Sequence, residues 1–295
     1  MSYPIVSMVN EWWVARKGMA FGLISASSGF TGAVMPFIIE ALLAKYGHKT
    51  TLKASAAAMA ILTFPLLFLF KPRLPPSRQF SLARANWSFF DRSLFWAFSA
   101  SILIQGIGFF FPSVFLPSYA AEVGISPTNG ALLLSLMSIA QVLGQFAFGW
   151  LSDKNLPVSL LASICCIVAA VSTFGLWGMA KSMSLLIPFS LIYGFFSFGF
   201  ATMRVAMGRA VSDDPSTIFS TYAIFVFLQG VGNILVGPIS AGLMSKATVM
   251  SRFAAGKYEG IVVLTGSSSY VHSVTNYLCA LNDSIPEPRW NATLV

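Results

Sequence analysis

Long apolar runs separated by short polar stretches make up most of the chain. A transmembrane helix needs about 20 mostly apolar residues to cross roughly 30 Å of hydrocarbon. Runs of that length predict seven transmembrane helices and a less regular eighth, over residues 18–44, 50–70, 93–118, 128–151, 157–180, 183–207, 216–245 and 258–281. Backbone groups in hydrocarbon must be hydrogen-bonded internally, so runs this long have to be helical. The pattern therefore predicts an all-α, polytopic transmembrane helix bundle.

The composition agrees with a lipid environment. Hydrophobic residues make up 56% of the chain and charged residues 9%, whereas soluble domains carry about 25% charged residues. The net charge of +8 does not indicate a nucleic-acid partner, because the cations stand between apolar runs, where they orient helices in a membrane. The three cysteines lack metal-ligand or disulfide spacing, and we expect no metal and no cofactor. We predict an integral multi-pass protein, in the plasma membrane by default or in an organellar membrane.

Residues 71–92 interrupt the apolar pattern with a basic, proline-containing stretch. It carries three prolines, one acid and five cations: Lys71, Arg73, Arg78, Arg84 and Arg92. Basic loops are favoured on the cytoplasmic side of a membrane. We therefore expect a cytoplasmic linker that joins residues 1–70 to residues 93–281, with residues 282–295 as a tail.

Few polar side chains interrupt the predicted spans, and the amides among them are candidates for a solute pathway. They are Gln105, Gln141, Gln145, Gln229 and Asn233. Gln141 and Gln145 are four residues apart and share one helix face, as do Gln229 and Asn233. A buried amide either hydrogen-bonds between helices or contributes to a solute path, and both readings stay open. Amides donate and accept, so they suit a polar solute without imposing a charge.

Two charged residues in or beside the spans also have two readings each. Glu40 lies four residues before the end of its predicted span, where it either serves as a proton site or simply reaches water. Arg204 follows the run GFFSFGF and either meets an anionic solute or marks the cytoplasmic boundary. His272 lies in the eighth predicted helix without a second metal-ligand type and stays unassigned. The sequence shows no acid pair within a span, no HExxH motif, no phosphate loop and no Ser/His/Asp arrangement. Nothing in it therefore indicates an enzyme.

Four stretches of the chain resemble loops and helices of one known protein family. The stretch NEWWVARKGMAFGLISASSGFTGAVMPF resembles the cytoplasmic loop and fifth helix of that family, and KYGHKTTLKASA with KPRLP resembles its fifth-to-sixth connection and sixth helix. MGRAVSDDPS and GVGNILVGPISAGL resemble its tenth-to-eleventh loop and eleventh helix. The segment GQFAFGWLSDK resembles the loop signature G-x-L-[SA]-D-[RK], carried here by Gly149, Leu151, Ser152, Asp153 and Lys154. The chain thus resembles monocarboxylate-transporter-like members of the major facilitator superfamily, particularly the fungal branch, and the resemblance covers residues 10–263.

The resemblance implies a secondary active transporter, of the symporter type, for a small organic solute such as a monocarboxylate or a related metabolite. Two six-helix bundles would face a central path that opens alternately to each side. A cytoplasmic gate would comprise Arg16, Lys17, Gly149, Asp153 and Lys154, with Asp153 near helix N-termini and basic residues of the neighbouring helix. The implied partners are a small-molecule substrate and the lipid bilayer.

The chain departs from the family pattern at three places. It begins where the fourth helix should be ending, so residues 1–70 would be the remainder of an N-terminal bundle and residues 93–281 a C-terminal six-helix bundle, about seven or eight spans of an expected twelve. The acid–arginine pair of animal members aligns with Gln141 and Gln145, and a neutral pair cannot exchange a proton. The residues after KYEGIVVL do not continue the last helix of the family. A misread splice junction would explain both ends.

A second hypothesis follows from the expected absence of the first four helices. Alternating access needs two bundles that face each other, and eight helices leave one face of the central path open. The chain would then be a non-transporting membrane component or an incomplete fragment of a transporter. A homo-oligomer is a further arrangement that would fill the gap.

Overall fold

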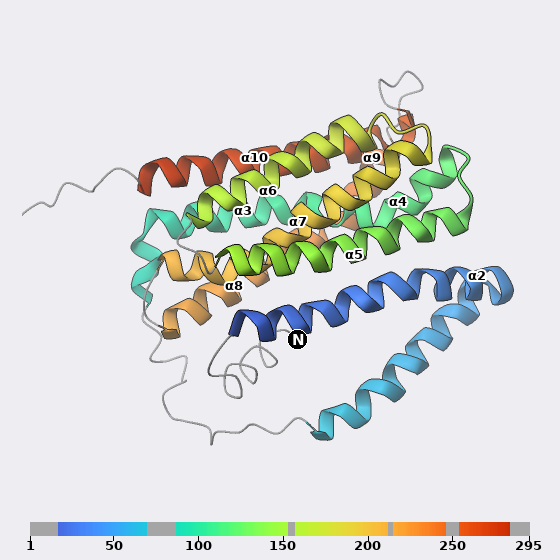
Figure 1. Ribbon diagram of the computed structural model, residues 1–295, viewed down its shortest axis with the longest axis horizontal. Coiled ribbons are helices and arrows are strands. Elements are labelled where there is room, and N and C mark those ends of the chain that lie inside the picture. Colours follow the sequence, from blue (N-terminus) through green and yellow to red (C-terminus); the bar gives the residue numbers. More distant parts are fainter. Residues whose placement is uncertain (1–16, 70–86, 153–156, 212–214, 246–253, 284–295) are drawn as a thin grey trace, which may run out of the picture.

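The computed structural model describes residues 17–69, 87–152, 157–211, 215–245 and 254–283, and they form helices without a strand among them (Figure 1). The α-helices are α2 (Lys17–Leu69), α3 (Ser93–Phe109), α4 (Phe111–Glu122), α5 (Pro127–Ser152), α6 (Val158–Ser172), α7 (Met183–Val211), α8 (Pro215–Ile234), α9 (Val236–Ser245) and α10 (Glu259–Asp283). Short turns of other helical types are η3 (Trp87–Asp91), η4 (Thr173–Trp177) and η5 (Gly256–Tyr258). The all-α prediction is confirmed.

Six helical segments of the described chain are long and apolar enough to cross a membrane. They are Gly29–Leu66, Ser93–Glu122, Pro127–Ser152, Val158–Trp177, Met183–Arg204 and Ser220–Ser245. The first combines two predicted spans, and the other five each match one. The protein is therefore an integral multi-pass membrane protein, as its apolar runs predict.

The first two predicted spans form one long helix, α2, which bends sharply at Gly47. Gly47 has φ 72° and ψ 171°, a conformation that glycine adopts without the penalty of a Cβ atom. A Cβ there would meet no atom within 4 Å, so backbone conformation rather than space requires the glycine. The first arm of α2 runs beside α5, whereas the second arm diverges from the other helices (Figure 1).

Two other predicted spans are interrupted, each just before a proline. The breaks fall at Phe110, between α3 and α4, and at Leu235, between α8 and α9. Pro112 and Pro238 lack the N–H that would bond the carbonyl four residues earlier, so each removes one hydrogen bond from the helix at the break. It resumes at once, because the N–H groups two residues after Pro112 and one residue after Pro238 bond the carbonyls of Phe110 (3.1 Å) and Leu235 (3.0 Å).

The eighth predicted span forms a continuous helix, α10, which packs against α3 and α6. Its buried face is unusually polar and includes Thr265, Ser268, Ser269, His272, Ser273 and Asn276. The Ser163 hydroxyl of α6 donates to the Ser273 carbonyl, and the Ser273 hydroxyl donates to the Ser163 carbonyl, both at 3.2 Å. Polar contacts thus join α10 to the bundle, which explains why its composition gives a weaker apolar signal than the other spans.

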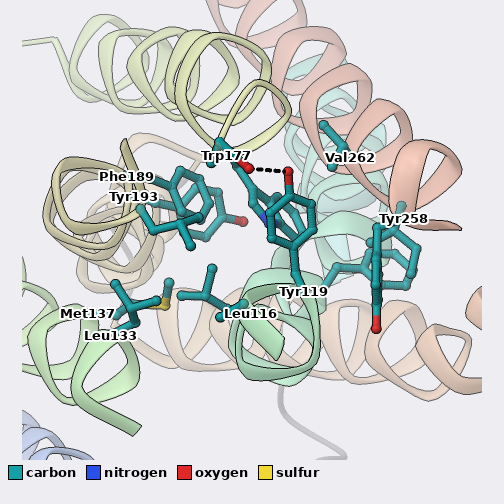
Figure 2. Packing of buried hydrophobic residues seen from close by; sticks show 14 of the residues in the cluster. Leu116, Tyr119, Leu133, Met137, Trp177, Phe189, Tyr193, Tyr258 and Val262 are labelled. Atoms are coloured by element: carbon teal, nitrogen blue, oxygen red, sulfur yellow. Dashed lines mark hydrogen bonds between the residues drawn. The ribbon is translucent and has the colours of Figure 1, made fainter. Parts of the chain in front are cut away.

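One aromatic cluster fills the part of the bundle where α4, α7 and η4 meet (Figure 2). Trp177 stacks on Phe189 with 5.3 Å between ring centroids, and Tyr119 lies 5.9 Å from Trp177. The Tyr119 hydroxyl donates to the Ala180 carbonyl at 3.1 Å, which is the dashed line in Figure 2. Tyr193 extends the cluster toward α3 by donating to the Phe109 carbonyl at 3.2 Å.

A second apolar cluster joins α3, α6, α7 and α8. Phe225 stacks on Phe95 at 5.9 Å and meets the edge of Phe98 at 6.4 Å. Cys165 and Cys166 pack in this cluster as free, buried thiols. These two cysteines therefore act as small apolar residues in the core.

Helices α5 and α7 approach each other through glycine. A Cβ on Gly144 would lie 2.0 Å from the Phe195 carbonyl oxygen, and a Cβ on Gly194 would lie 2.4 Å from the Met137 carbonyl oxygen. Small residues allow such backbone contact between membrane helices, where lipid supplies little hydrophobic drive for association. The α5–α7 contact is therefore a backbone-to-backbone contact that tolerates no side chain at Gly144.

We expect Gly144→Ala to lower stability by about 1–3 kcal/mol, because the new methyl group forces α5 and α7 apart. Gly149→Ala is the matched control on the same helix, since a Cβ there meets no atom within 4 Å. At a helical position with free space, alanine stabilises a helix by about 1 kcal/mol relative to glycine, so Gly149→Ala should not lower stability. Thermal unfolding of the detergent-purified protein measures both variants. Equal midpoints for the two would contradict the backbone contact.

We expect Tyr119→Phe to lower the free energy of unfolding by about 1 kcal/mol, because it removes the hydroxyl bonded to the Ala180 carbonyl in a fully buried cluster. Tyr277→Phe is the control, because Tyr277 is 50% exposed and should change stability by less than about 0.5 kcal/mol. The same unfolding assay compares the two substitutions. A Tyr119→Phe protein as stable as the control would show that the hydrogen bond contributes nothing.

Candidate functional site

The predicted amide pair on α5 lies between two contact faces of that helix. On one face, the Ser135 hydroxyl donates to the Ala33 carbonyl of α2 at 2.5 Å. On the other face, Gly144 contacts α7. At about 100° per residue, Gln141 and Gln145 fall on the strip between these faces. We call this pair the Gln145 strip, and it lies where α2, α5 and α7 come together.

The two amides of the Gln145 strip differ in burial. Gln145 is 8% exposed, and its Oε1 atom is buried without a hydrogen-bond partner in the described part of the chain. Gln141 is half-buried. Sharing one helix face, as predicted, they present amide groups along about one turn of α5.

Gln105 and Gln229 lie at a close contact between α3 and α8. A Cβ on Gly106 would be 3.0 Å from the Gln229 carbonyl oxygen, and a Cβ on Gly232 would be 2.7 Å from the Gly106 carbonyl carbon. Gln105 is 4% exposed and Gln229 is 6% exposed. The Oε1 of Gln105 and the Oδ1 of Asn233 are buried and meet no hydrogen-bond partner among the residues that the structure places.

Arg204 is buried against this amide group and does not stand at a solvated helix end. It is 8% exposed, its Nη1 donates to Gln229 Oε1, and its Nε lacks a partner within the described residues. It shares a face of α7 with Tyr193, which bonds α3, and with Phe200. Phe195, whose backbone contacts Gly144 of α5, is nine residues from Arg204 and so lies about 180° around α7 from it. Arg204 and the Gln145 strip therefore lie on opposite sides of α7.

His272 is fully buried on α10, beside the same face of α7. Its ring meets Phe200 edge-to-face with centroids 4.6 Å apart. Its Nδ1 lies 2.7 Å from the Ser101 carbonyl oxygen and also contacts the Ser101 hydroxyl. A proton on Nδ1 is needed to bond that carbonyl. Nε2 then keeps a lone pair, and it meets no partner in the part of the chain that the structure covers.

Asn276 extends the polar group by one turn of α10. Its Nδ2 donates to the His272 carbonyl at 2.9 Å, and its buried Oδ1 has no partner among the described residues. Sequence reasoning left His272 unassigned and missed Asn276. The signal that could have found them is their spacing of four residues within an otherwise Ser-rich helix. We call Ser101, Gln105, Arg204, Gln229, His272 and Asn276 the Arg204 cluster.

Glu40 lies apart from both polar groups. The Thr128 hydroxyl donates to Glu40 Oε1 at 3.4 Å, near the start of α5, and the pair is exposed. Thirteen residues of helix, or about 20 Å, separate Thr128 from Gln141. The structure therefore does not bring Glu40 together with the amides.

The predicted cytoplasmic gate falls mostly outside the described residues. Arg16, Asp153 and Lys154 are not described, and Lys17 is placed only as the first residue of α2. Gly149 lies on α5, and a Cβ there would meet nothing within 4 Å. The gate stays a prediction.

Comparison with known proteins identifies relatives in one transporter superfamily. The sequence profile described as Major Facilitator Superfamily matches residues 1–237. The MFS transporter asaE of Aspergillus flavus is 24% identical over 264 residues, which cover 89% of this chain and 58% of the relative. The aspyridones efflux protein apdF of Emericella nidulans is 24% identical over 245 residues, covering 82% and 49%.

An animal transporter has the same level of sequence identity to this chain. Monocarboxylate transporter 12 of Xenopus laevis is 24% identical over 304 residues, which cover 92% of this chain and 63% of the relative. The chain thus spans about half the length of the curated relatives that it matches.

Proposed function

Because the chain belongs to the major facilitator superfamily, we propose that it serves secondary active transport of a small organic solute by alternating access. Its integral multi-pass character and relatives named as transporters or efflux proteins support transmembrane transport. The plasma membrane is the proposed location. The family of relatives is one of transporters, which supports a role other than catalysis.

The observation that carries this proposal is the set of buried amide oxygens without partners. Amides that only join helices are expected to be hydrogen-bonded, because an unpaired buried polar group is costly. Within the described residues, the side-chain oxygens of Gln105, Gln145 and Asn233 have no such bond. These groups are therefore available to a polar solute or to water.

The Gln145 strip is the proposed solute contact. It lies between the α2 and α7 contacts of α5 and includes one half-buried and one buried amide. Its neutral side chains suit the hydrogen-bonding groups of a monocarboxylate-like molecule or a related metabolite, and coupling to a proton would use other residues. We propose that α2 belongs to an N-terminal bundle and α3–α10 to a C-terminal bundle, joined by the basic linker on the cytoplasmic side.

A second candidate function is favoured by the exposure of α2. Only 6% of the apolar stretch in Gly29–Leu66 is buried inside the protein. Residues of the second arm, Leu52, Met59, Ile61, Leu62 and Phe64, are 65–71% exposed. A membrane component that works only together with another polypeptide would present such an arm. Transport by the purified chain alone in liposomes separates the two functions, because such a component would not transport by itself.

We expect the double substitution Gln141→Ala and Gln145→Ala to abolish solute transport while leaving membrane insertion intact. The amides would no longer offer hydrogen bonds to the solute, and alanine keeps the helix. Proteoliposomes containing the chain, alone or preceded by the N-terminal helices of asaE, are tested for uptake of candidate metabolites with and without a pH gradient.

The matched control is Asn129→Ala, which removes an exposed amide from the first turn of the same helix. It should transport like the unmodified protein. Full transport by the Gln141→Ala, Gln145→Ala double variant would exclude the Gln145 strip from the pathway. In a different outcome, the chain alone does not transport in any variant, and the added helices restore transport. That result would establish that transport depends on a second polypeptide segment.

A further inference from the structure

The Arg204 cluster contains a positive charge that no described carboxylate balances. The described carboxylates that are placed with their side chains are Glu40, Asp91, Glu122 and Glu259. Glu40 pairs with Thr128, and the other three stand in η3 or at the ends of α4 and α10. Arg204 instead bonds the neutral amide of Gln229. A buried charge is normally paired, and an ionisable residue inside a membrane protein indicates a functional site.

The other members of the cluster close around the head of this arginine. Side chains of a helix lean toward its N-terminus, and Phe200 lies one turn before Arg204 on the same face of α7. Phe200 contacts His272. His272 is in turn bonded to Ser101, one helical turn before Gln105 on α3. The guanidinium therefore contacts α8 and lies on the side of α7 that also faces α3 and α10.

Hydrogen-bond donors in this cluster remain available. The Nε–H group of Arg204 is buried and meets no acceptor among the described residues. The Gln105 amide is not held by a bond to its oxygen, so rotation about its last torsion can present the NH₂ group instead. One cationic donor and one neutral donor in a buried site form an arrangement that accepts an anion.

The space beside Arg204 sets the size of that anion. Arg204 is 8% exposed and Gln229 6% exposed, and the Nε atom of Arg204 is itself buried, so a ligand reaches this N–H only after small movements of neighbouring side chains. The Gly106–Gly232 contact holds α3 and α8 too close for a larger molecule to pass between them. A single small ion fits this description, whereas an organic metabolite does not.

We propose that Arg204, with Gln229 and Gln105, binds a small monovalent inorganic anion of the chloride type inside the α3–α7–α8–α10 group. The ion neutralises the guanidinium and accepts its unused N–H. The site lies on the opposite side of α7 from the Gln145 strip and is independent of the proposed solute contact. Binding of the ion to the folded state alone stabilises the protein by an amount that grows with the logarithm of the ion concentration once this exceeds the dissociation constant.

Thermal unfolding of the full chain in detergent tests this site with chloride and bromide as probes. Sodium gluconate keeps the ionic strength constant while chloride or bromide replaces it. We expect the unfolding midpoint to rise with the logarithm of the halide concentration, by roughly 5–10 °C at about 100 times the dissociation constant. Lys181→Gln removes an exposed cation and should keep this response. No rise with either halide would overturn the proposal.

Two substitutions in the cluster decide whether the response belongs to Arg204. Arg204→Gln should abolish it. Because that variant could fail to fold, Gln229→Glu provides a second test, since it places a carboxylate beside the guanidinium with almost no change of shape. We expect Gln229→Glu in gluconate to be at least as stable as the unmodified protein and insensitive to halide. A halide response retained in Gln229→Glu, or a response to acetate without one to chloride, would overturn the assignment.

Discussion

The requirement that polar groups find partners inside the protein shapes this structure more than any other interaction. In hydrocarbon an unpaired backbone N–H or carbonyl costs several kcal/mol, so the chain crosses the membrane as helices. Two of the helices break for one residue shortly before Pro112 and Pro238, where a donor is missing, and then resume. Because lipid is as apolar as leucine, the helices associate through backbone contacts at Gly144, Gly194 and Gly106 instead of through hydrophobic drive.

The same requirement separates structural polar side chains from candidate functional ones. Many serine and threonine hydroxyls in the spans donate to carbonyls of their own helix, as Ser190 does to Leu186 and Thr265 to Ile261. Such hydroxyls are hydrogen-bonded within their own helix and need no solute as a partner. The side-chain oxygens of Gln105, Gln145 and Asn233 and the Nε–H of Arg204 make no such bond within the described residues. A buried group that cannot bond its own helix needs a partner from another helix, from water or from a ligand.

Sequence pattern predicted the parts of the structure that depend on local periodicity. Apolar runs gave the helices, and a spacing of four residues placed Gln141 with Gln145 on one face of α5. The pattern did not predict that 18–44 and 50–70 join at Gly47, because a helix bend of this kind depends on one positive φ angle. Nor did it predict the bond between Arg204 and Gln229, which are 25 residues apart, because that pair depends on how α7 and α8 rotate against each other. His272 was left unassigned because its contacts with Ser101 and Phe200 also depend on how helices pack.

The two sides of α5 differ in how easily they can move, and this bears on alternating access. Toward α7, a Cβ on Gly144 would collide with the Phe195 backbone, so sliding of these helices would require their backbones to separate. Toward α2, glycine contacts are made to side-chain atoms of Val142 and Ser138, which can change rotamer. We therefore infer that α5 and α7 move as one rigid unit and that the α2–α5 contact is the surface that rearranges. The Gln145 strip lies beside that surface, where such a rearrangement would expose or cover its amides.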